Sequence, residues 1–285
     1  MWSSLPDLGV GIGFRSQFQS EVFSHRDKIG FLEIVAEHFL DASSEKKKEL
    51  ELLSEHFTIV PHGLNLSIGS AEGIDEKYLK KMANLIDIIN PPWWSEHICF
   101  TRAGGIDIGH LSPLPFTLEA VDTICRNVEL VRKYINKPLI LENITYIFPV
   151  PGSEMDEAAF ISEVLNKTGC GMLLDITNLY TNSVNHGYEP KNFLKQIPAE
   201  KIVQLHFVGG HWSGDLLIDS HSHPTFPEIW ELMKEVTGMT NIKGMILERD
   251  DNFPVFSELL DELEQAKKIK TLFESGFSEF KKLTG

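Results

Sequence analysis

The chain has 285 residues, of which 42% are hydrophobic and 24% charged, and its formal net charge is −15. This composition is typical of a globular protein with a large buried core, and the negative charge opposes binding to the polyanionic backbone of a nucleic acid. The three cysteines lack paired spacing and no segment has the roughly 18 apolar residues of a membrane span, so we expect a cytoplasmic protein that binds neither nucleic acid nor membrane.

Short apolar runs bounded by turn residues are predicted to be strands. In chain order they cover residues 8–14, 30–36, 57–63, 93–100, 137–143, 171–178, 201–210 and 242–250. Amphipathic stretches lie between them, with apolar residues at the three- and four-residue spacing of a helix. The clearest of these are 43–56, 75–89, 116–135 and 156–167. Eight strand–helix units in a chain of this length predict an α/β fold, a single TIM (β/α)8 barrel domain over residues 1–285.

Two polar connections are longer than the 2 to 6 residues of a typical strand–helix loop. They are residues 101–115 and 206–223. The second contains four histidines and two aspartates, and these side chains are the usual ligands of zinc and of non-haem iron. Long loops at the carboxyl ends of barrel strands usually belong to the functional face, so we expect both segments to lie near the site.

The third to the eighth expected strands each carry a histidine or a carboxylate near the carboxyl end. These residues are His62, His97, Glu142, Asp175, His206 and Glu248. In a TIM barrel such side chains converge at the mouth, where the chemistry of this fold takes place. Three carboxylates crowded together repel one another unless a cation lies between them. The pattern therefore predicts a metal site rather than a purely structural cluster.

These positions, with Asp219 and His221, resemble the trinuclear metal constellation of the xylose-isomerase-like TIM barrels, which include the endonuclease IV type. Within that superfamily the chain is more similar to the multinuclear non-haem iron-dependent oxidative enzymes, formerly the domain of unknown function 692 group, which include the methanobactin-biosynthesis oxidase. The likeness extends from residue 9 to residue 250. It is carried by "GVGIGFR", "FLEIVAEHF", "PHGLNLSIGS", "SEHICF", "LEN", "LLDITNLYTN", "HFVGGH", "DSHSHP" and "ERD".

The resemblance implies three neighbouring metal positions. Asn178 would be a ligand of the third, at a place where the nuclease branch has a histidine. An amide oxygen is a harder ligand than imidazole, which shifts the preference from zinc toward iron or manganese. The implied ligands are His62 and His97 for the first ion, with Glu142 bridging to the second; Asp175, His206 and Glu248 for the second; and Asn178, Asp219 and His221 for the third.

The activity implied by the resemblance is the oxidative modification of cysteine in a ribosomally made peptide. The cofactors would be two or three iron ions in mixed Fe(II) and Fe(III) states, with dioxygen as co-substrate. One iron would bind the cysteine thiolate, and dioxygen activated at its neighbour would remove hydrogen from the β-carbon. The partners would be a cysteine-containing precursor peptide and a separate leader-recognition protein. Heterocycle and thioamide formation, carbon excision and thiol rearrangement all remain open as outcomes.

The candidate catalytic residues are the bridging Glu142, together with His211 and Asp250. His211 follows two glycines and is a candidate contact for substrate or dioxygen, although a loop histidine bonded to backbone is an equally good interpretation. Asp250 is a candidate acid or base, or an orienting residue. Metal-bound histidines usually need a partner for their second ring nitrogen. Candidates for orienting the ligands are Glu33, Glu37 and Asn143.

Three other functions are compatible with a metal-binding barrel. A phosphodiesterase or endonuclease of the endonuclease IV type would use a metal-activated hydroxide, but no basic groove is evident in a chain of net charge −15. A divalent-metal sugar isomerase needs only two ions, which leaves Asn178, Asp219 and His221 without a role. A non-enzymatic metal-binding module is the least favoured, because a barrel mouth with open ligand positions is typical of a catalytic site.

Overall fold

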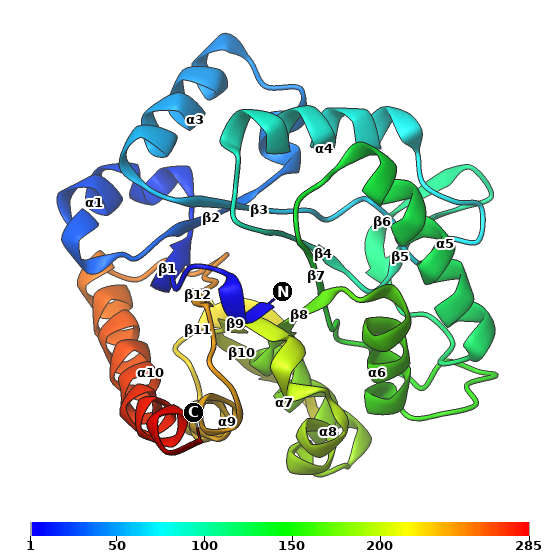
Figure 1. Ribbon diagram of the computed structural model, residues 1–285. Helices are drawn as coiled ribbons and strands as arrows, with labels where there is room; N and C mark the ends of the chain where they lie inside the picture. Colours follow the sequence, from blue (N-terminus) through cyan, green and yellow to red (C-terminus); the bar gives the residue numbers. More distant parts are fainter. Residues whose placement is uncertain (1, 285) are drawn as a thin grey trace.

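A closed barrel of eight parallel strands forms the centre of the molecule (Figure 1). The computed structural model describes residues 2–284, with side chains described as far as residue 272. The strand order around the barrel is β1-β12-β9-β8-β7-β4-β3-β2. The strands are β1 (Gly9–Gly13), β2 (Leu32–Val35), β3 (Ile59–His62), β4 (Trp94–His97), β7 (Leu139–Glu142), β8 (Gly171–Asp175), β9 (Ile202–Phe207) and β12 (Gly244–Leu247). Each expected run contains one barrel strand, which confirms the predicted TIM barrel.

Helices surround the barrel and cover its outer surface (Figure 1). They are α1 (Gln19–Ser24), α2 (Glu37–Leu40), α3 (Ser44–His56), α4 (Glu76–Ile89), α5 (Leu118–Tyr134), α6 (Glu157–Thr168), α7 (Ile176–His186), α8 (Pro190–Gln196), α9 (Pro227–Met239) and α10 (Phe256–Thr284). Several begin at a side chain that accepts a backbone hydrogen bond, such as Ser43 before α3 and Asp156 before α6. Among the described helices, none is long and apolar enough to cross a membrane.

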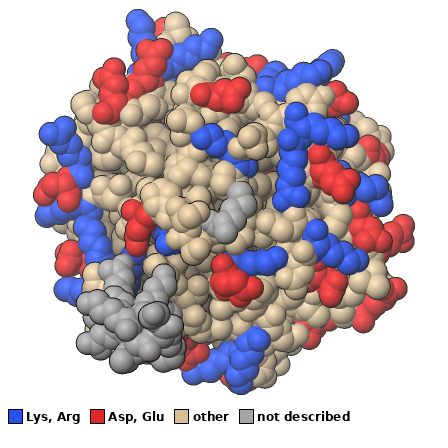
Figure 2. All heavy atoms as spheres, viewed as in Figure 1, with Lys and Arg blue, Asp and Glu red and all other residues tan. Residues whose placement is uncertain are grey.

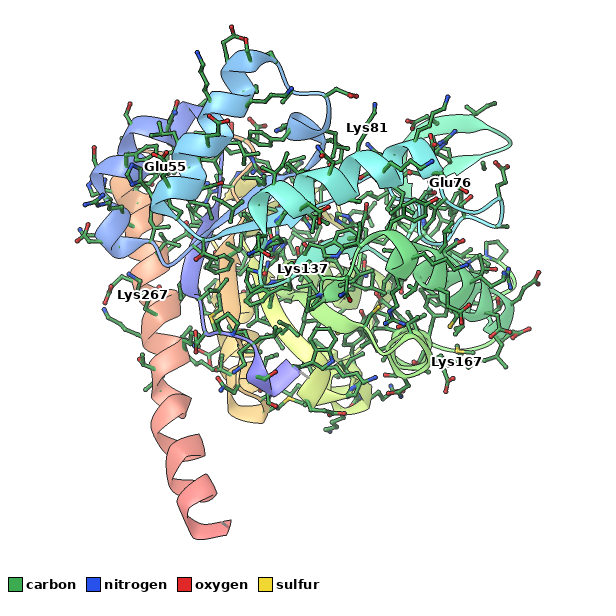
Figure 3. The ribbon with its side chains drawn as sticks, turned by 45° about the horizontal axis from the view of Figure 1, so that its top comes forward. Glu55, Glu76, Lys81, Lys137, Lys167 and Lys267 are labelled. Atoms are coloured by element: carbon green, nitrogen blue, oxygen red, sulfur yellow. The ribbon has the colours of Figure 1, made fainter. Side chains whose placement is uncertain are left out.

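The last helix, α10, packs against β1 and α9 on the outside of the barrel. Its buried residues include Leu259, Leu263, Ala266 and Ile269. The three- and four-residue spacing of these side chains places them on one face of the helix. The carboxyl-terminal part of α10 projects past the barrel (Figure 3).

Four expected strands end three residues earlier in the structure than the apolar runs predicted, namely those of runs 93–100, 171–178, 201–210 and 242–250. The run 171–178 leaves the strand at Asp175 and continues as α7, because the Asp175 carboxylate accepts a hydrogen bond of 2.8 Å from the backbone N–H of Asn178 and caps the helix. The run 201–210 leaves β9 after Phe207. An apolar residue follows each of these two boundaries directly, Ile176 after Asp175 and Val208 after Phe207, so composition did not reveal where the two strands end.

The two long connections are antiparallel hairpins, where the sequence predicted polar loops. They consist of β5 (Phe100–Ala103) with β6 (Ile106–Ser112), and β10 (Gly209–Ser213) with β11 (Leu216–His223). In the second hairpin a Cβ atom at Gly209 would lie 1.9 Å from the carbonyl oxygen of Pro224, and one at Gly210 would lie 2.2 Å from that of Ile218. Only glycine permits this close approach of the two strands.

The barrel interior has an apolar floor with polar side chains above it. The floor consists of Phe31, Val60, Trp93, Ile140, Leu173, Val203 and Ile246. Alternate residues of a strand point to the same side, so the next inward position after Val60 is His62, and after Ile140 it is Glu142. Trp2, Leu5 and Leu8 pack beneath the floor and cover the amino-terminal end of the barrel. Acidic and basic side chains alternate around the rim of that end (Figure 2).

Candidate metal centre

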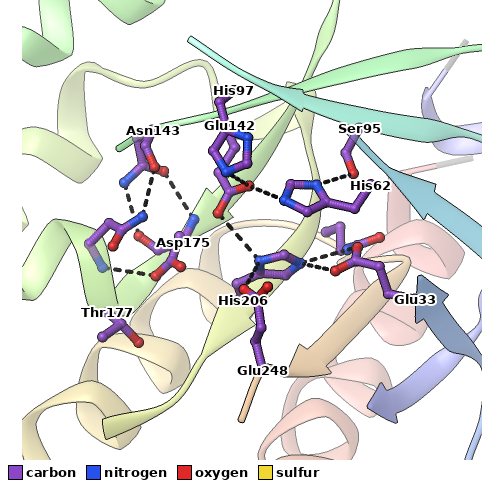
Figure 4. Close-up of polar contacts among 12 residues, drawn as sticks. Glu33, His62, Ser95, His97, Glu142, Asn143, Asp175, Thr177, His206 and Glu248 are labelled. Atoms are coloured by element: carbon purple, nitrogen blue, oxygen red, sulfur yellow. Dashed lines mark hydrogen bonds and ion pairs between the residues drawn. The ribbon is translucent and has the colours of Figure 1, made fainter. Parts of the chain in front are cut away.

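The strand-end side chains singled out in the sequence lie together above the barrel floor (Figure 4). They form two groups, and within each group one potential ligand atom from every residue lies within 4.8 Å of all the others. Glu142 belongs to both groups, which is the position that a bridging carboxylate occupies. The first group is His62, His97 and Glu142; the second is Glu142, Asp175, His206 and Glu248.

Two imidazoles of the first group point at one carboxylate oxygen. Oε2 of Glu142 lies 3.3 Å from Nε2 of His62 and 3.2 Å from Nε2 of His97. The other ring nitrogens have partners of their own, because Nδ1 of His62 bonds to the Ser95 hydroxyl at 2.8 Å and Nδ1 of His97 donates to the Gly63 carbonyl at 3.1 Å. Nε2 of each ring is therefore the nitrogen left to bind an ion.

The ring of His206 is oriented in the same way in the second group. Its Nε2 lies 2.7 Å from Oε1 of Glu33. The other carboxylate oxygen of Glu33, Oε2, accepts a 2.6 Å hydrogen bond from Nε2 of Gln204. Its Nδ1 faces Glu142 at 3.3 Å and Glu248 at 2.9 Å. Glu33 therefore holds the imidazole so that Nδ1 points into the group, which is the orienting role expected for it.

Asn143 fixes Asp175 and Asn178 from behind. Its side chain donates to the carbonyl of Asp175 and accepts from the N–H of that residue, both at 3.0 Å. Its carbonyl accepts a 3.0 Å hydrogen bond from Nδ2 of Asn178. Oδ1 of Asn178 and Oδ2 of Asp175 are buried without a hydrogen-bond partner. The amide of Asn178 is thereby oriented with its oxygen free.

A third group forms where the β10–β11 hairpin meets the end of β12. Nε2 of His221 lies 2.8 Å from Oδ1 of Asp219, and Nδ1 of the same ring lies 3.0 Å from Oδ2 of Asp250. The His, Asp and Glu atoms that converge here are those of His221, Glu248 and Asp250. Asp250 thus lies in a potential ligand group, and it is also bound by Arg15 through Nε at 2.8 Å.

Buried polar atoms that form no hydrogen bond concentrate at this centre. In the described part of the chain, eleven buried side-chain nitrogen or oxygen atoms have no hydrogen-bond partner, and six of them belong to the predicted ligands. Four of the six lie 2.8–3.3 Å from a histidine or carboxylate atom without forming a well-directed hydrogen bond, whereas Asp175 Oδ2 and Asn178 Oδ1 have no such contact. A buried polar atom without any partner costs about 1–3 kcal/mol, so native proteins leave few of them. Divalent cations would satisfy all six, and imidazole nitrogen with carboxylate oxygen is a donor set that fits iron. The six are Glu142 Oε2, Asp175 Oδ2, Asn178 Oδ1, His206 Nδ1, Asp219 Oδ1 and His221 Nε2.

The carboxylates of the centre have opposed protonation tendencies. Burial favours the neutral form of Glu142, but the imidazoles of His97, His206 and His62 lower its pKa to about 2. Burial raises the pKa of Asp175 to about 8, and the neighbouring carboxylates of Glu142 and Asp219 act in the same direction. The surrounding side chains therefore do not supply enough positive charge to keep Asp175 ionised at neutral pH. A cation bound beside Asp175 would favour its ionised form.

Three residues around the ligands were missed in the sequence. Ser95 and Gln204 lie two residues before His97 and His206, so the alternation of the strands places them on the same inward face and was a usable signal. Arg15 follows the first strand, and its guanidinium lies 3.6 Å from Glu248 in addition to binding Asp250. Arginine is not a metal ligand, so the strand-end pattern of histidine and carboxylate does not include this residue.

Two expected site residues have partners elsewhere. His211 bonds through Nδ1 to the Ser220 hydroxyl at 2.9 Å, so its hydrogen bond stays within the β10–β11 hairpin. Its contact with substrate or dioxygen remains a prediction. Glu37 does not orient a predicted ligand but accepts hydrogen bonds from the backbone N–H groups of Leu64 and Asn65, at 2.8 and 2.9 Å. It fixes the segment after β3.

Replacing Glu33 by Gln is expected to lower metal affinity by about 10- to 100-fold, because the ring of His206 loses the charged partner that orients it. Metal titration of the apoprotein measures the change. Glu55→Gln, on the exposed surface of α3, is the matched control and should titrate like the unaltered protein (Figure 3). Equal affinity in Glu33→Gln would show that Glu33 does not support a ligand.

Comparison with known proteins gives matches along nearly the whole chain. A family model described as "RiPP precursor modification enzyme MbnB/TglH/ChrH" matches residues 9–271. A UPF0276 protein of Caulobacter vibrioides is 32% identical over 263 residues, which cover 92% of this chain and 94% of that protein. A UPF0276 protein of Shewanella oneidensis is 36% identical over 259 residues, which cover 90% and 92% of the two chains.

Solved structures with a similar fold have low sequence identity to this chain. A D-psicose 3-epimerase from Clostridium cellulolyticum, solved with D-tagatose, has a TM-score of 0.58 at 10% identity and covers 95% of this chain and 98% of its own. Endonuclease IV from Thermus thermophilus also has a TM-score of 0.58, at 14% identity, and covers 92% of this chain and 99% of its own. These matches show the same TIM-barrel fold and carry no further conclusion about activity.

Proposed function

The chain belongs to the MbnB/TglH/ChrH family of RiPP precursor modification enzymes, and from this premise we propose that it oxidises cysteine residues of a ribosomally made peptide with two or three non-haem iron ions and dioxygen. The family makes it an enzyme that modifies a ribosomally synthesised peptide. The observation that carries the metal part is the convergence of histidine and carboxylate atoms at the barrel mouth, together with two buried oxygens there, Asp175 Oδ2 and Asn178 Oδ1, that have no hydrogen-bond partner. The choice of iron is supported by Asn178, whose free amide oxygen is a harder donor than the imidazole it replaces.

The proposed ligands divide among the three ions as in the resemblance. Bound iron would supply a site for the substrate thiolate and for dioxygen. The protein itself supplies orientation, because Ser95, Gly63 and Glu33 each fix one imidazole ring. Since these partners belong to the barrel strands or their immediate ends, the donor atoms are held on a rigid support.

A cysteine thiol must lose its proton to bind a metal ion, and the His221–Asp250 pair is suited to receive it. Nδ1 of His221 and Oδ2 of Asp250 lie 3.0 Å apart, so a proton can be held between them. The side chain of Asp250 is 39% exposed, whereas that of Glu248 is 9% exposed. The pair therefore connects the buried cluster with solvent, which is the acid–base role proposed for Asp250.

Peptide turnover tests this function. The iron-loaded protein is incubated with a cysteine-containing peptide and with its serine counterpart, in air and under nitrogen, and products are followed by mass spectrometry. We expect a mass change only for the cysteine peptide and only with oxygen, aided by a leader-recognition partner where one is supplied. Zinc-dependent hydrolysis of a phosphodiester, with both peptides unchanged under all conditions, would replace this proposal by the hydrolase.

A further inference from the structure

A cavity of about 320 Å³ is bounded by α6, α8, the end of α7 and the segment 143–156. That segment follows Glu142 directly, so the cavity is attached to the strand end that carries the proposed bridging ligand. Its volume is in the range of sites that hold a small molecule or one large side chain. Four aromatic side chains contribute to its wall, namely Phe116, Tyr146, Tyr188 and Phe193.

Glu157 is the buried polar group of this cavity. It is 8% exposed, and its carboxylate accepts hydrogen bonds from Tyr146 at 3.2 Å, Tyr188 at 3.3 Å and Asn182 at 3.3 Å. These bonds are longer than the roughly 2.7–2.8 Å typical of a hydroxyl donor, so the carboxylate is only weakly satisfied. No lysine or arginine within the described residues pairs with it. Burial raises the pKa of Glu157 to about 7, and the three hydrogen bonds oppose this rise.

The lining has the character of a site for a cation with an apolar stem. Asp156 and Glu189 join Glu157 in it, and none of the described lining residues is Lys or Arg. Aromatic rings attract cations through their negative faces. The methylene groups of a long basic side chain also pack well on apolar walls such as Val150 and Met155.

We propose that this cavity binds a lysine or arginine side chain of the peptide substrate, with its stem along the aromatic wall and its charged head on Glu157. The inference rests on the proposed function, because it assumes a peptide substrate.

Ile147 and Phe148, in the same segment, are 65% and 64% exposed. Since Tyr146 and Pro149 on either side of them line the cavity, they offer an apolar surface to the neighbouring residues of that peptide.

The cavity is held rigidly with respect to the proposed centre. Asn182 donates to the carbonyl of Ile144 at 2.9 Å as well as to Glu157. One turn earlier on α7, Asn178 donates to the carbonyl of Asn143. These two bonds tie α7 to the segment after β7, so a basic residue seated in the cavity would place the adjoining peptide at a set distance from the metal ligands.

Binding of capped single residues to the metal-loaded full chain tests the inference. The probes are Nα-acetyl-lysine methylamide and its uncharged analogue Nα-acetyl-norleucine methylamide, with the arginine and citrulline derivatives as a second pair, and Kd is measured by NMR titration. We expect at least tenfold tighter binding of the charged member of a pair at pH 8. Glu157→Gln should abolish the difference, while Glu154→Gln, an exposed carboxylate of the same segment, should retain it.

The affinity for the charged probes should also depend on pH. With the pKa of Glu157 at about 7, roughly a tenth of the carboxyl is ionised at pH 6 and about nine tenths at pH 8, so affinity should rise about tenfold between them. The groups that face this carboxyl are Tyr146, Tyr188 and Asp156, with His186 stacked on the Tyr146 ring at 4.3 Å. Glu157→Gln should remove the rise.

Equal affinity of the unaltered protein for lysine and norleucine probes would overturn the inference without any variant. A charge preference that persists in Glu157→Gln would overturn it too, because the charged head would then not rest on Glu157. The probes contain no cysteine and are not oxidised, so this result is independent of turnover. Failure of the peptide to be oxidised, with the lysine preference intact, would instead count against the proposed function.

Discussion

Glu142→Gln is expected to lose at least one metal ion per chain and to lower turnover by about a thousandfold or more. Glu142 is the residue that both strand-end ligand groups share, and its Oε2 faces the Nε2 atoms of His62 and His97. Glutamine keeps the size of the side chain but removes the negative charge and one of the two anionic oxygens that would bridge two ions. Elemental analysis and turnover of the same preparation measure both effects.

The barrel should remain folded in this variant, as judged by circular dichroism, because the apolar floor beneath the centre is untouched. The matched control is Glu119→Gln, an exposed carboxylate in the first turn of α5, which should keep the full metal content and activity. A Glu142→Gln protein with unchanged metal content and normal turnover would show that this carboxylate bridges nothing. His206→Ala and Asp175→Ala are expected to lose metal and turnover in the same way.

Asn178→His is expected to shift metal selectivity from iron toward zinc and to lower iron-dependent turnover by about 100-fold. The imidazole introduced is a softer donor than the amide oxygen that the structure leaves free at this position. It also lacks the amide N–H that bonds to the carbonyl of Asn143, so the carbonyl loses its partner. Competition between equal concentrations of ferrous and zinc ions, followed by elemental analysis, measures the selectivity.

Asn166→His is the control for this substitution, because Asn166 lies on the exposed side of α6. It should leave both selectivity and turnover unchanged. If Asn178→His binds iron and zinc in the same ratio as the unaltered protein, Asn178 is not a ligand. The preference for iron must then come from other residues of the centre.

The ligand positions at the strand ends could be predicted because two regular features of the sequence coincide there. Alternation along a strand sets which residues point inward, and the closure of the barrel brings the carboxyl ends together. Val60 and His62 on β3, like Ile140 and Glu142 on β7, show the apolar floor followed by a polar position two residues later. The alternation is local, and the repeat of eight strand–helix units predicts the closed barrel, so a single sequence indicates both features.

The pairing of Arg15 with Asp250 could not be predicted in this way. The two residues are 235 positions apart, and they meet because β1 and β12 are neighbours in the closed barrel. Nothing near either residue in the sequence indicates the partner. The group formed by His221, Glu248 and Asp250 depends on the same closure together with the fold of the β10–β11 hairpin, which explains why Asp250 was assigned only a general role.

The hairpins were missed for a different physical reason. The first five residues of β6 are all exposed, so no buried face imposes an alternation of apolar and polar residues on that strand. In its partner β5 the buried position is Thr101, so that strand shows no alternation of apolar and polar residues either. Length and polarity of the segment therefore predicted a loop, whereas backbone hydrogen bonds between the two strands hold the structure.

Elemental analysis of the protein purified under anaerobic conditions without added metal tests the account most directly, since every role proposed for the barrel mouth depends on bound iron. We predict two or three iron ions per chain, with a visible absorption band that changes on addition of a cysteine peptide and not of its serine counterpart. Stoichiometric zinc, or a chain that takes up no metal while its barrel is intact, would contradict it.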